Sequence, residues 1–175
     1  MSGTPGDLIE RATRLGQALQ AGGWRITTAE SCTGGSLAAA LTEVPGSSGW
    51  FDYGFVTYSN AAKTDLLGVP PVIFATDGAV SAACVTAMTL GAMTRAKAHL
   101  AVAISGIAGP GGGTPDKPVG TVWLAFRWRA SLSVAPLAAE VEVQRLQLPG
   151  DRAAVRAQAV QQALDFPLHW LNRNE

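Results

Sequence analysis

The chain has 175 residues, 47% of them apolar, and its 13 basic side chains balance its 13 acidic ones. This length suits one domain with a full core, and no apolar run approaches the roughly 20 residues that a membrane-spanning helix needs. Zero net charge with scattered basic residues argues against a nucleic-acid surface. We therefore expect one domain over residues 1–175, with a core over about 7–170, that binds neither nucleic acid nor a membrane.

The cysteines and histidines form no pattern typical of a metal site. Cys32 and Cys84 make no CxxC pair, and His99 and His169 lie far apart in the sequence. A protein metal site needs several convergent ligands, so we expect no metal and no other cofactor. The segment over 1–16 is polar and lacks the apolar stretch of a secretory signal. Free thiols in a reducing cytoplasm are therefore the expected setting.

The first half of the chain alternates helical and extended patterns. Apolar residues recur at helical spacing from Leu8 to Leu19, and Gly22-Gly23 closes this segment. Another glycine pair, Gly34-Gly35, separates a strand from a short helix, and Ser59 or Asn60 can cap a later helix. In chain order, the predicted elements are a helix over 7–22, a strand over 24–29, a helix over 36–43, a strand over 51–58 and a helix over 60–67.

The second half contains a nearly continuous apolar strand, HLAVAISG, which is typical of a strand buried on both faces. The predicted elements are a loop opened by Pro70-Pro71, a helix over 81–97 capped by Ser81, a strand over 99–106, a glycine-rich loop over 106–118, strands over 119–128 and 137–148 that could form a hairpin, and a last helix from 151 that Pro167 bends or ends. Helices and strands mix along the whole chain without a repeat or linker. The pattern predicts an α/β domain with a mixed sheet.

Three loops follow predicted strands and could meet at one edge of such a sheet, where open α/β sheets bind ligands. In the first, TTAESCTGG, Ser31 stands just before a helix start. Backbone N–H groups there could face an anion or a developing oxyanion. The alternative is a strand–helix connection in which Ser31 and Thr33 only cap. The N–H groups concerned are those of Cys32, Thr33, Gly34 and Gly35.

The second loop supplies Tyr58 at a strand end and Lys63 in the first turn of the next helix. Both burial and a helix N-terminus would lower the pKa of a lysine, and a neutral lysine could take the proton of Ser31. The alternative is a solvated lysine on an exposed helix face. Cys32 has no neighbouring histidine to act as its base, so we expect its thiol, like that of Cys84, to serve packing.

The third loop, SGIAGPGGGTPDKP, is rich in glycine, which lets a backbone approach a ligand closely. It matches neither a dinucleotide-binding GxGxxG followed by a helix nor a P-loop. The alternative is a mobile connector. Arginines near the C-terminal helix offer another anion site: Arg152 and Arg156 share one helix face, and Arg145 precedes them. For Arg152 and Arg156 the alternative, a solvated helix surface, is favoured.

Together, five segments resemble the CinA C-terminal domain family: TTAESCTGG, GSSGWFDYGFVTYSNAAKTDLLGV, DGAVS, AISGIAGPGGGTPDKPVGTVW and GDRAAVRAQA. The similarity runs collinearly over about residues 7–170, and the chain looks like the family's stand-alone form, the PncC-type nicotinamide-nucleotide amidohydrolases. The resemblance implies a three-layer α/β/α domain that associates as a homodimer or higher homo-oligomer. It also implies metal-free hydrolysis of a small-molecule mononucleotide, nicotinamide mononucleotide, to nicotinate mononucleotide and ammonia in pyridine-nucleotide salvage.

The resemblance also implies residue roles. The nucleophile falls on Ser31, and the assisting tyrosine and lysine fall on Tyr58 and Lys63. A basic substrate-binding residue falls on Arg145. The glycine-rich ligand loop falls on 105–113, which includes Ser105, Gly106, Ala108 and Gly109.

Other functions share this pattern. A catalytically weak or inactive nucleotide-binding regulatory module would keep the fold and the ligand loops without turnover. An amidase for another small amide and an accessory protein of DNA uptake are further alternatives. A base beside a hydroxyl favours the enzyme, and the lack of a basic stripe argues against direct DNA binding.

Overall fold

A five-stranded mixed sheet forms the centre of the molecule, in a computed structural model that describes residues 5–173. The strands are β1 (Ile26–Glu30), β2 (Phe51–Val56), β3 (Leu100–Gly106), β4 (Thr121–Trp128) and β5 (Glu140–Gln147), in the spatial order β2-β1-β3-β4-β5. β1 runs parallel to both β2 and β3, whereas β4 is antiparallel to β3 and β5 is antiparallel to β4. The predicted mixed sheet and the predicted pairing of the last two strands are confirmed.

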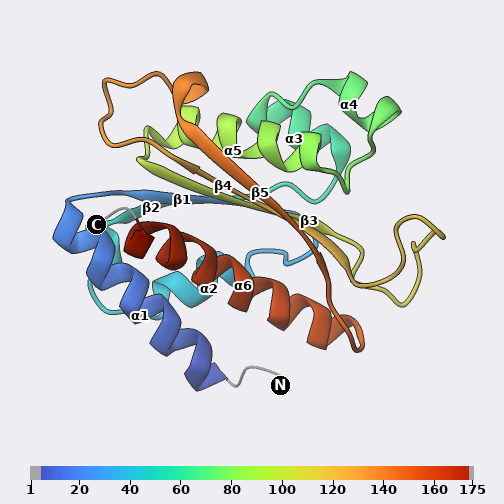
Figure 1. Ribbon diagram of the computed structural model, residues 1–175, viewed down its shortest axis with the longest axis horizontal. Coiled ribbons are helices and arrows are strands. Elements are labelled where there is room, and N and C mark those ends of the chain that lie inside the picture. The colour runs from blue at the N-terminus through green and yellow to red at the C-terminus, as the bar shows by residue number, and fades with distance from the viewer. Residues whose placement is uncertain (1–4, 174–175) are drawn as a thin grey trace.

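Helices cover both faces of the sheet, so the predicted three-layer α/β/α arrangement is confirmed (Figure 1). One face carries α1 (Pro5–Gly22), α2 (Ser36–Thr42) and α6 (Arg152–Arg173), and the other carries α3 (Asn60–Leu67), α4 (Pro71–Thr76) and α5 (Ala82–Ala96). Short 3-10 turns span Ser47–Gly49 and Pro136–Ala138. No helix within residues 5–173 combines the length and the apolar composition needed to cross a bilayer.

Large and small apolar side chains alternate along β3, so the strand contributes to two hydrophobic cores. Leu100, Val102 and Ile104 belong to the core shared with α1, α2 and α6, whereas Ala101 and Ala103 belong to the core shared with α5. Successive side chains of a strand point to opposite faces, so the large and the small residues separate. The small residues on the second face allow α5 to pack close to the sheet.

One predicted boundary is wrong, and of the two effects expected of Pro167, a bend or an end of the last helix, the end is excluded. The loop expected at Pro70-Pro71 contains α4, in which Pro71 takes the first helical position, where a missing N–H costs nothing. The last helix does not end at Pro167 but continues to Arg173. Its flanking side chains, Phe166 and Leu168, are buried in the core, and this packing outweighs the hydrogen bond that proline cannot donate.

The parallel strands β1, β2 and β3 all deliver their carboxyl ends to the same edge of the sheet. β1 leads there into α2, β2 leads into α3, and β3 leads into the glycine-rich loop, drawn in gold in Figure 1. The three loops that the sequence predicted to meet therefore lie at one edge, where the polar residues of each can contact one another.

Candidate active site

A tight turn carries Ser31 directly after β1. The Ser31 N–H donates to the Ile104 carbonyl at 3.0 Å, and the Gly34 N–H donates to the Ser31 carbonyl at 3.1 Å. Gly34 and Gly35 have φ angles of 60° and 96°, a region that favours glycine. The glycine pair therefore lets the chain reverse immediately after the serine, whose side chain is only 9% exposed.

The carboxylate of Glu30 occupies the N-terminus of α2. It is fully buried and accepts hydrogen bonds from the N–H groups of Gly35 at 3.1 Å, Leu37 at 3.0 Å and Ala38 at 2.8 Å. Two of the four N–H groups expected to face a ligand, those of Gly34 and Gly35, are therefore bonded within the chain. Those of Cys32 and Thr33 donate to no backbone carbonyl of another described residue, although the Cys32 N–H lies beside its own sulfur.

Lys63 lies in the first turn of α3 with 1% of its surface exposed. Its Nζ is 3.0 Å from Ser31 Oγ, 2.8 Å from the Thr57 carbonyl and 3.3 Å from the Tyr58 carbonyl. Burial disfavours the charged ammonium and lowers the pKa of Lys63 below its ordinary value of 10.5. The lysine is thus a buried amine in contact with the serine hydroxyl and not a solvated surface cation.

Burial shifts the pKa values of the neighbouring thiols in the opposite direction to that of Lys63. Burial raises the pKa of Cys32 to about 11, and burial likewise raises the pKa of Cys84 to about 11. Both thiols are free, buried and protonated near neutral pH. Because a thiolate is the reactive form of cysteine, this environment makes Cys32 a poor nucleophile beside Ser31.

A pocket of about 220 Å³ opens over Ser31 and Lys63. Its lining combines Ser31, Cys32, Tyr58, Asn60, Lys63, Ala79, Val80, Ser105, Gly106, Ala108 and Arg152. Seven of these eleven belong to the set expected from the sequence, and all three loops contribute to the pocket.

Hydrogen bonds join residues of the pocket wall to one another. Ser105 is buried and its hydroxyl donates to the Ala79 carbonyl at 2.7 Å, which joins the end of β3 to the segment before α5. The Tyr58 side chain is 60% exposed, and its hydroxyl accepts a hydrogen bond of 3.1 Å from Arg152. Arg152 also donates to the Gly109 carbonyl at 3.0 Å.

The remaining expected residues lie behind or beside the pocket. Thr33 is buried, and its carbonyl accepts a hydrogen bond of 3.0 Å from Arg156. Arg145 is exposed on β5 and donates to the Asp116 carbonyl at 2.8 Å. Among the described residues, the pocket lining does not include Arg145.

Four lining residues were not among those expected: Asn60, Ala79, Val80 and Arg152. Asn60 was weighed as a helix cap, but Ser59 takes that position through the Ala62 N–H and leaves Asn60 beside the pocket. Ala79 and Val80 belong to the DGAVS segment, whose residue types carry no chemical signal. Arg152 was considered and assigned to the solvated helix surface.

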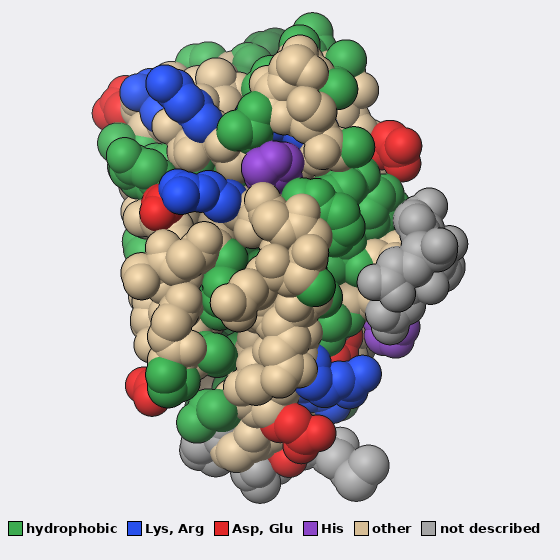
Figure 2. Space-filling model, turned by 90° about the vertical axis from the view of Figure 1, so that its left-hand side faces the viewer, with side chains coloured by type: hydrophobic (Ala, Val, Ile, Leu, Met, Phe, Trp, Pro, Cys, Tyr) green, Lys and Arg blue, Asp and Glu red, His purple; other side chains and the backbone are tan. Residues whose placement is uncertain are grey.

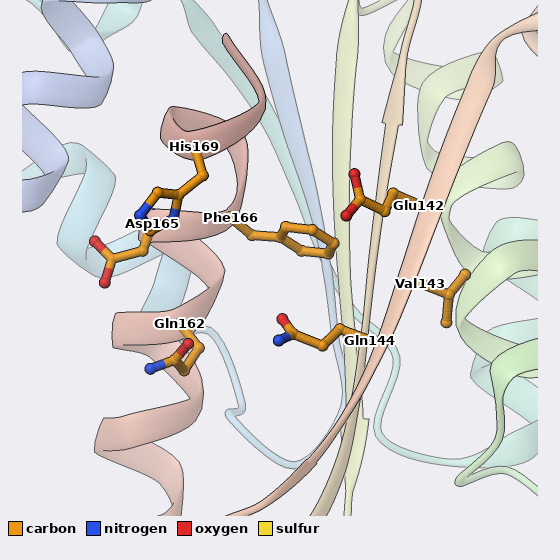
Figure 3. A pocket seen from close by; sticks show the side chains of 7 residues that line it. All are labelled: Glu142, Val143, Gln144, Gln162, Asp165, Phe166 and His169. Carbon is orange, nitrogen blue, oxygen red and sulfur yellow. The ribbon is translucent and has the colours of Figure 1, made fainter. Parts of the chain in front are cut away.

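A larger hollow of about 550 Å³ lies between β5 and α6 (Figure 3). Phe166 and His169 of α6 and Glu142 and Gln144 of β5 surround it. Its Asp165 is ion-paired with Arg11 of α1. The hollow contains no pair of a nucleophile and a buried base, so the chemistry belongs to the smaller pocket at the carboxyl ends of the strands.

The described residues offer little to ligands of other kinds. Within residues 5–173, no group of three or more His, Cys, Asp or Glu side chains is placed to hold a metal ion. Figure 2 shows the end of the molecule opposite the candidate site. The described Lys and Arg side chains on that face form small separate groups between acidic and apolar ones.

This fold and site, a three-layer α/β/α domain with a serine hydroxyl against a buried lysine amine, agree with the comparison with known families. The family model for the CinA C-terminal domain matches residues 9–171. The chain belongs to the CinA C-terminal domain family.

Two relatives match the chain over most of their own length. A nicotinamide-nucleotide amidohydrolase PncC of Pseudomonas putida is 55% identical over 154 residues, which cover 88% of this chain and 91% of that protein. The protein of the same name from Escherichia coli K12 is 49% identical over 161 residues, 92% of this chain and 93% of that protein. The crystal structure of the competence/damage inducible protein CihA from Agrobacterium tumefaciens has a TM-score of 0.88 at 44% identity, covering 98% of this chain and 99% of that one.

Proposed function

We propose that the protein hydrolyses the carboxamide of nicotinamide mononucleotide to nicotinate mononucleotide and ammonia, with Ser31 as nucleophile and Lys63 as base. The observation that carries this proposal is the 3.0 Å contact between Ser31 Oγ and the buried Lys63 Nζ. The names of the relatives from Pseudomonas putida and Escherichia coli supply the substrate and the reaction.

The surroundings of Lys63 support its role as a base. A neutral amine has two N–H hydrogens and one lone pair. The carbonyls of Thr57 and Tyr58 can accept the two hydrogens, which leaves the lone pair for the third neighbour, the Ser31 hydroxyl. In that state Ser31 donates its proton to Lys63, which is the direction of transfer that activates a serine.

The reaction then proceeds in two stages. Ser31 Oγ attacks the carboxamide carbon while its proton moves to Lys63, and the tetrahedral intermediate expels ammonia as the proton passes to the leaving nitrogen. This gives an ester of Ser31. Water then attacks the ester and gives up a proton to Lys63, which passes it to the Ser31 oxygen as the ester bond breaks and the carboxylate is released. Two neutral partners, amide and water, become one carboxylate and one ammonium, and no oxidant or reductant is consumed.

In this proposal, further groups stabilise the oxyanion and assist proton transfer in the transition state. The N–H groups of Cys32 and Thr33 hold the oxyanion, because those of Gly34 and Gly35 already bond within the turn. Tyr58 relays or orients the proton on its way to ammonia, and its hydroxyl is held for this task by Arg152 at 3.1 Å. The glycine-rich loop, through Gly106 and Ala108, bounds the space for the pyridine ring.

The experiment that tests the proposal measures ammonia released from nicotinamide mononucleotide by the purified protein, with the Ser31→Ala variant as control. Release by the wild-type protein and not by the variant supports hydrolysis at this serine. Binding of the mononucleotide without any release of ammonia would instead identify a nucleotide-binding regulatory module. Release from other small amides at a similar rate would identify a broader amidase.

The wider setting follows the family resemblance. We propose that the protein acts in the cytoplasm, in pyridine-nucleotide salvage, as a homodimer or higher homo-oligomer. Light scattering coupled to size-exclusion chromatography tests the assembly, since a strictly monomeric elution at working concentration would contradict it.

A further inference from the structure

The pocket over Ser31 is positively charged. Among the described residues, its lining holds two basic side chains, Lys63 and Arg152, and no carboxylate. Lys63 is buried at the floor of the pocket, where its charge is disfavoured. Arg152 is exposed, and a guanidinium stays protonated at any working pH. The permanent positive charge of the pocket therefore stands at its mouth.

The charge of Arg152 is not compensated by a described carboxylate. Its two hydrogen bonds go to neutral acceptors, the Gly109 carbonyl at 3.0 Å and the Tyr58 hydroxyl at 3.1 Å. A guanidinium has five N–H donors, so most of its donors remain unused. Within residues 5–173 it takes part in neither of the ion pairs, which join Arg11 to Asp165 and Arg25 to Asp52.

The two neighbouring arginines also take part in neither of these ion pairs, but unlike Arg152 they do not line the pocket. Arg145 donates to the Asp116 carbonyl at the far end of the glycine-rich loop and lies outside the pocket lining. Arg156 donates to the Thr33 carbonyl and the Ser36 hydroxyl behind the serine turn. Arg152 alone among these three faces the space where a ligand of Ser31 would lie.

The size of the pocket places the far end of a mononucleotide near Arg152. A volume of about 220 Å³ is less than the roughly 300–1,000 Å³ of sites that enclose a whole drug-sized ligand. With the carboxamide at Ser31, the pyridine ring fills the interior and the ribose phosphate extends to the mouth. The unused N–H donors of Arg152 match phosphate oxygens, which a guanidinium can bind in pairs.

We propose that Arg152 is the specificity residue that binds the 5′-phosphate of the substrate and so separates the mononucleotide from the nucleoside that lacks phosphate. This inference rests on the proposed function for the identity of the substrate. It differs from the expectation based on the family resemblance, which assigned the basic substrate-binding role to Arg145.

Binding to the Ser31→Ala protein tests the inference without turnover. Isothermal titration calorimetry measures the binding of nicotinamide mononucleotide and of nicotinamide riboside to the Ser31→Ala protein. The same measurements are made on double variants that combine Ser31→Ala with Arg152→Ala, with Arg152→Lys or, as matched control, with Arg145→Ala. We expect Arg152→Ala to weaken mononucleotide binding by about ten- to a hundredfold, the effect of losing charge-assisted hydrogen bonds, and to leave riboside binding within about twofold. Arg152→Lys should restore part of the loss, and Arg145→Ala should change neither ligand by more than about twofold.

Three results would overturn the inference. Equal weakening of both ligands by Arg152→Ala would mean that the residue only supports Tyr58 and the Gly109 loop. A phosphate-specific loss in Arg145→Ala but not in Arg152→Ala would return the role to Arg145. Failure of the mononucleotide to bind the folded Ser31→Ala protein would show that it is not the ligand of this pocket, and that Arg152 does not bind its phosphate. If Arg152→Ala shows the selective loss while the wild-type protein releases no ammonia, the proposed hydrolysis fails and the phosphate site stands.

Discussion

Lys63 Nζ lies 3.0 Å from Ser31 Oγ although 32 positions separate the two residues in the chain. The contact forms because β1 and β2 are parallel neighbours, which brings the turn after β1 beside the helix that follows β2. The Thr57 N–H donates to the Glu30 carbonyl at 2.8 Å and extends this pairing to the residue just before Ser31. Docking of these two strands is therefore what assembles the serine and its base.

Removal of the serine hydroxyl should abolish turnover. We expect Ser31→Ala to lower kcat by about 10⁴-fold or more, because a member of a nucleophile–base pair acts as part of a unit. Cys32→Ala should keep at least about a tenth of the activity, since its thiol is buried and has a pKa of about 11. Ammonia release measures both, with circular dichroism to verify folding. A folded, inactive Cys32→Ala beside an active Ser31→Ala would reverse the assignment.

Replacement of Lys63 by arginine should separate charge from basicity. A guanidinium keeps the positive charge but supplies no neutral amine, so we expect Lys63→Arg to lower kcat by about 10²–10⁴-fold, the usual contribution of a general base. The larger side chain can strain a position that is 1% exposed, so Lys63→Met provides a second variant of similar length. Near-normal kcat in either folded variant would exclude lysine as the base.

The pH dependence should follow the lowered pKa of Lys63. Only the neutral amine accepts the serine proton, so kcat/KM for the mononucleotide should rise with pH, with a midpoint below the ordinary lysine value of 10.5. The thiols of Cys32 and Cys84, at about 11, titrate above this limb. A profile that is flat from about pH 6 to pH 10 would contradict a titrating base.

The same pKa predicts how stability changes with pH. Between the lowered value in the folded protein and 10.5 in the unfolded chain, the unfolded state binds more protons, so the unfolding free energy rises with pH. Each pKa unit of lowering corresponds to about 1.4 kcal/mol. Urea denaturation of wild type and Lys63→Met should show the wild type gaining stability relative to the variant as pH rises toward 10.5. Parallel curves would mean that burial does not perturb this amine.

Local sequence rules found the elements and the loops of this site, because strand ends, glycine pairs and helix caps are short-range features. Ser31 and Lys63 became candidates in this way, the family resemblance supplied their roles, and the structure places them in contact. The same rules missed the place of Arg152, whose partners Tyr58 and Gly109 lie 94 and 43 positions away. An arginine at a helix start has the same local pattern whether solvent or a pocket lies beside it.

The role of Glu30 was missed for a related reason. A helix cap is sought at the residue directly before the helix, where a side chain reaches an N–H two or three positions ahead. Glu30 instead accepts from N–H groups five, seven and eight positions ahead, across a turn that its own sequence does not specify. Only the fold shows that this strand residue caps α2 and fixes the turn that carries Ser31.

Loss of the negative charge of this cap should destabilise the protein. In Glu30→Gln, the amide keeps one acceptor oxygen, and its NH₂ group faces N–H donors where the second oxygen stood. Oε2 receives the bonds from Gly35 and Leu37, and Oε1 receives the bond from Ala38, so either orientation loses at least one bond to a charged acceptor. We expect a loss of about 1.5–3 kcal/mol in unfolding free energy, measured by urea denaturation.

Activity should fall together with stability in this variant. A displaced α2 N-terminus shifts the turn of Ser31, and misplacement by about 1 Å can cost up to about a hundredfold in rate, so kcat should fall more than KM rises. Glu43→Gln is the matched control, because Glu43 is exposed at the other end of the same helix. It should change stability by no more than about 0.5 kcal/mol and leave kcat unchanged. If Glu30→Gln matched this control in both measurements, the buried carboxylate would not be what holds the serine against its base.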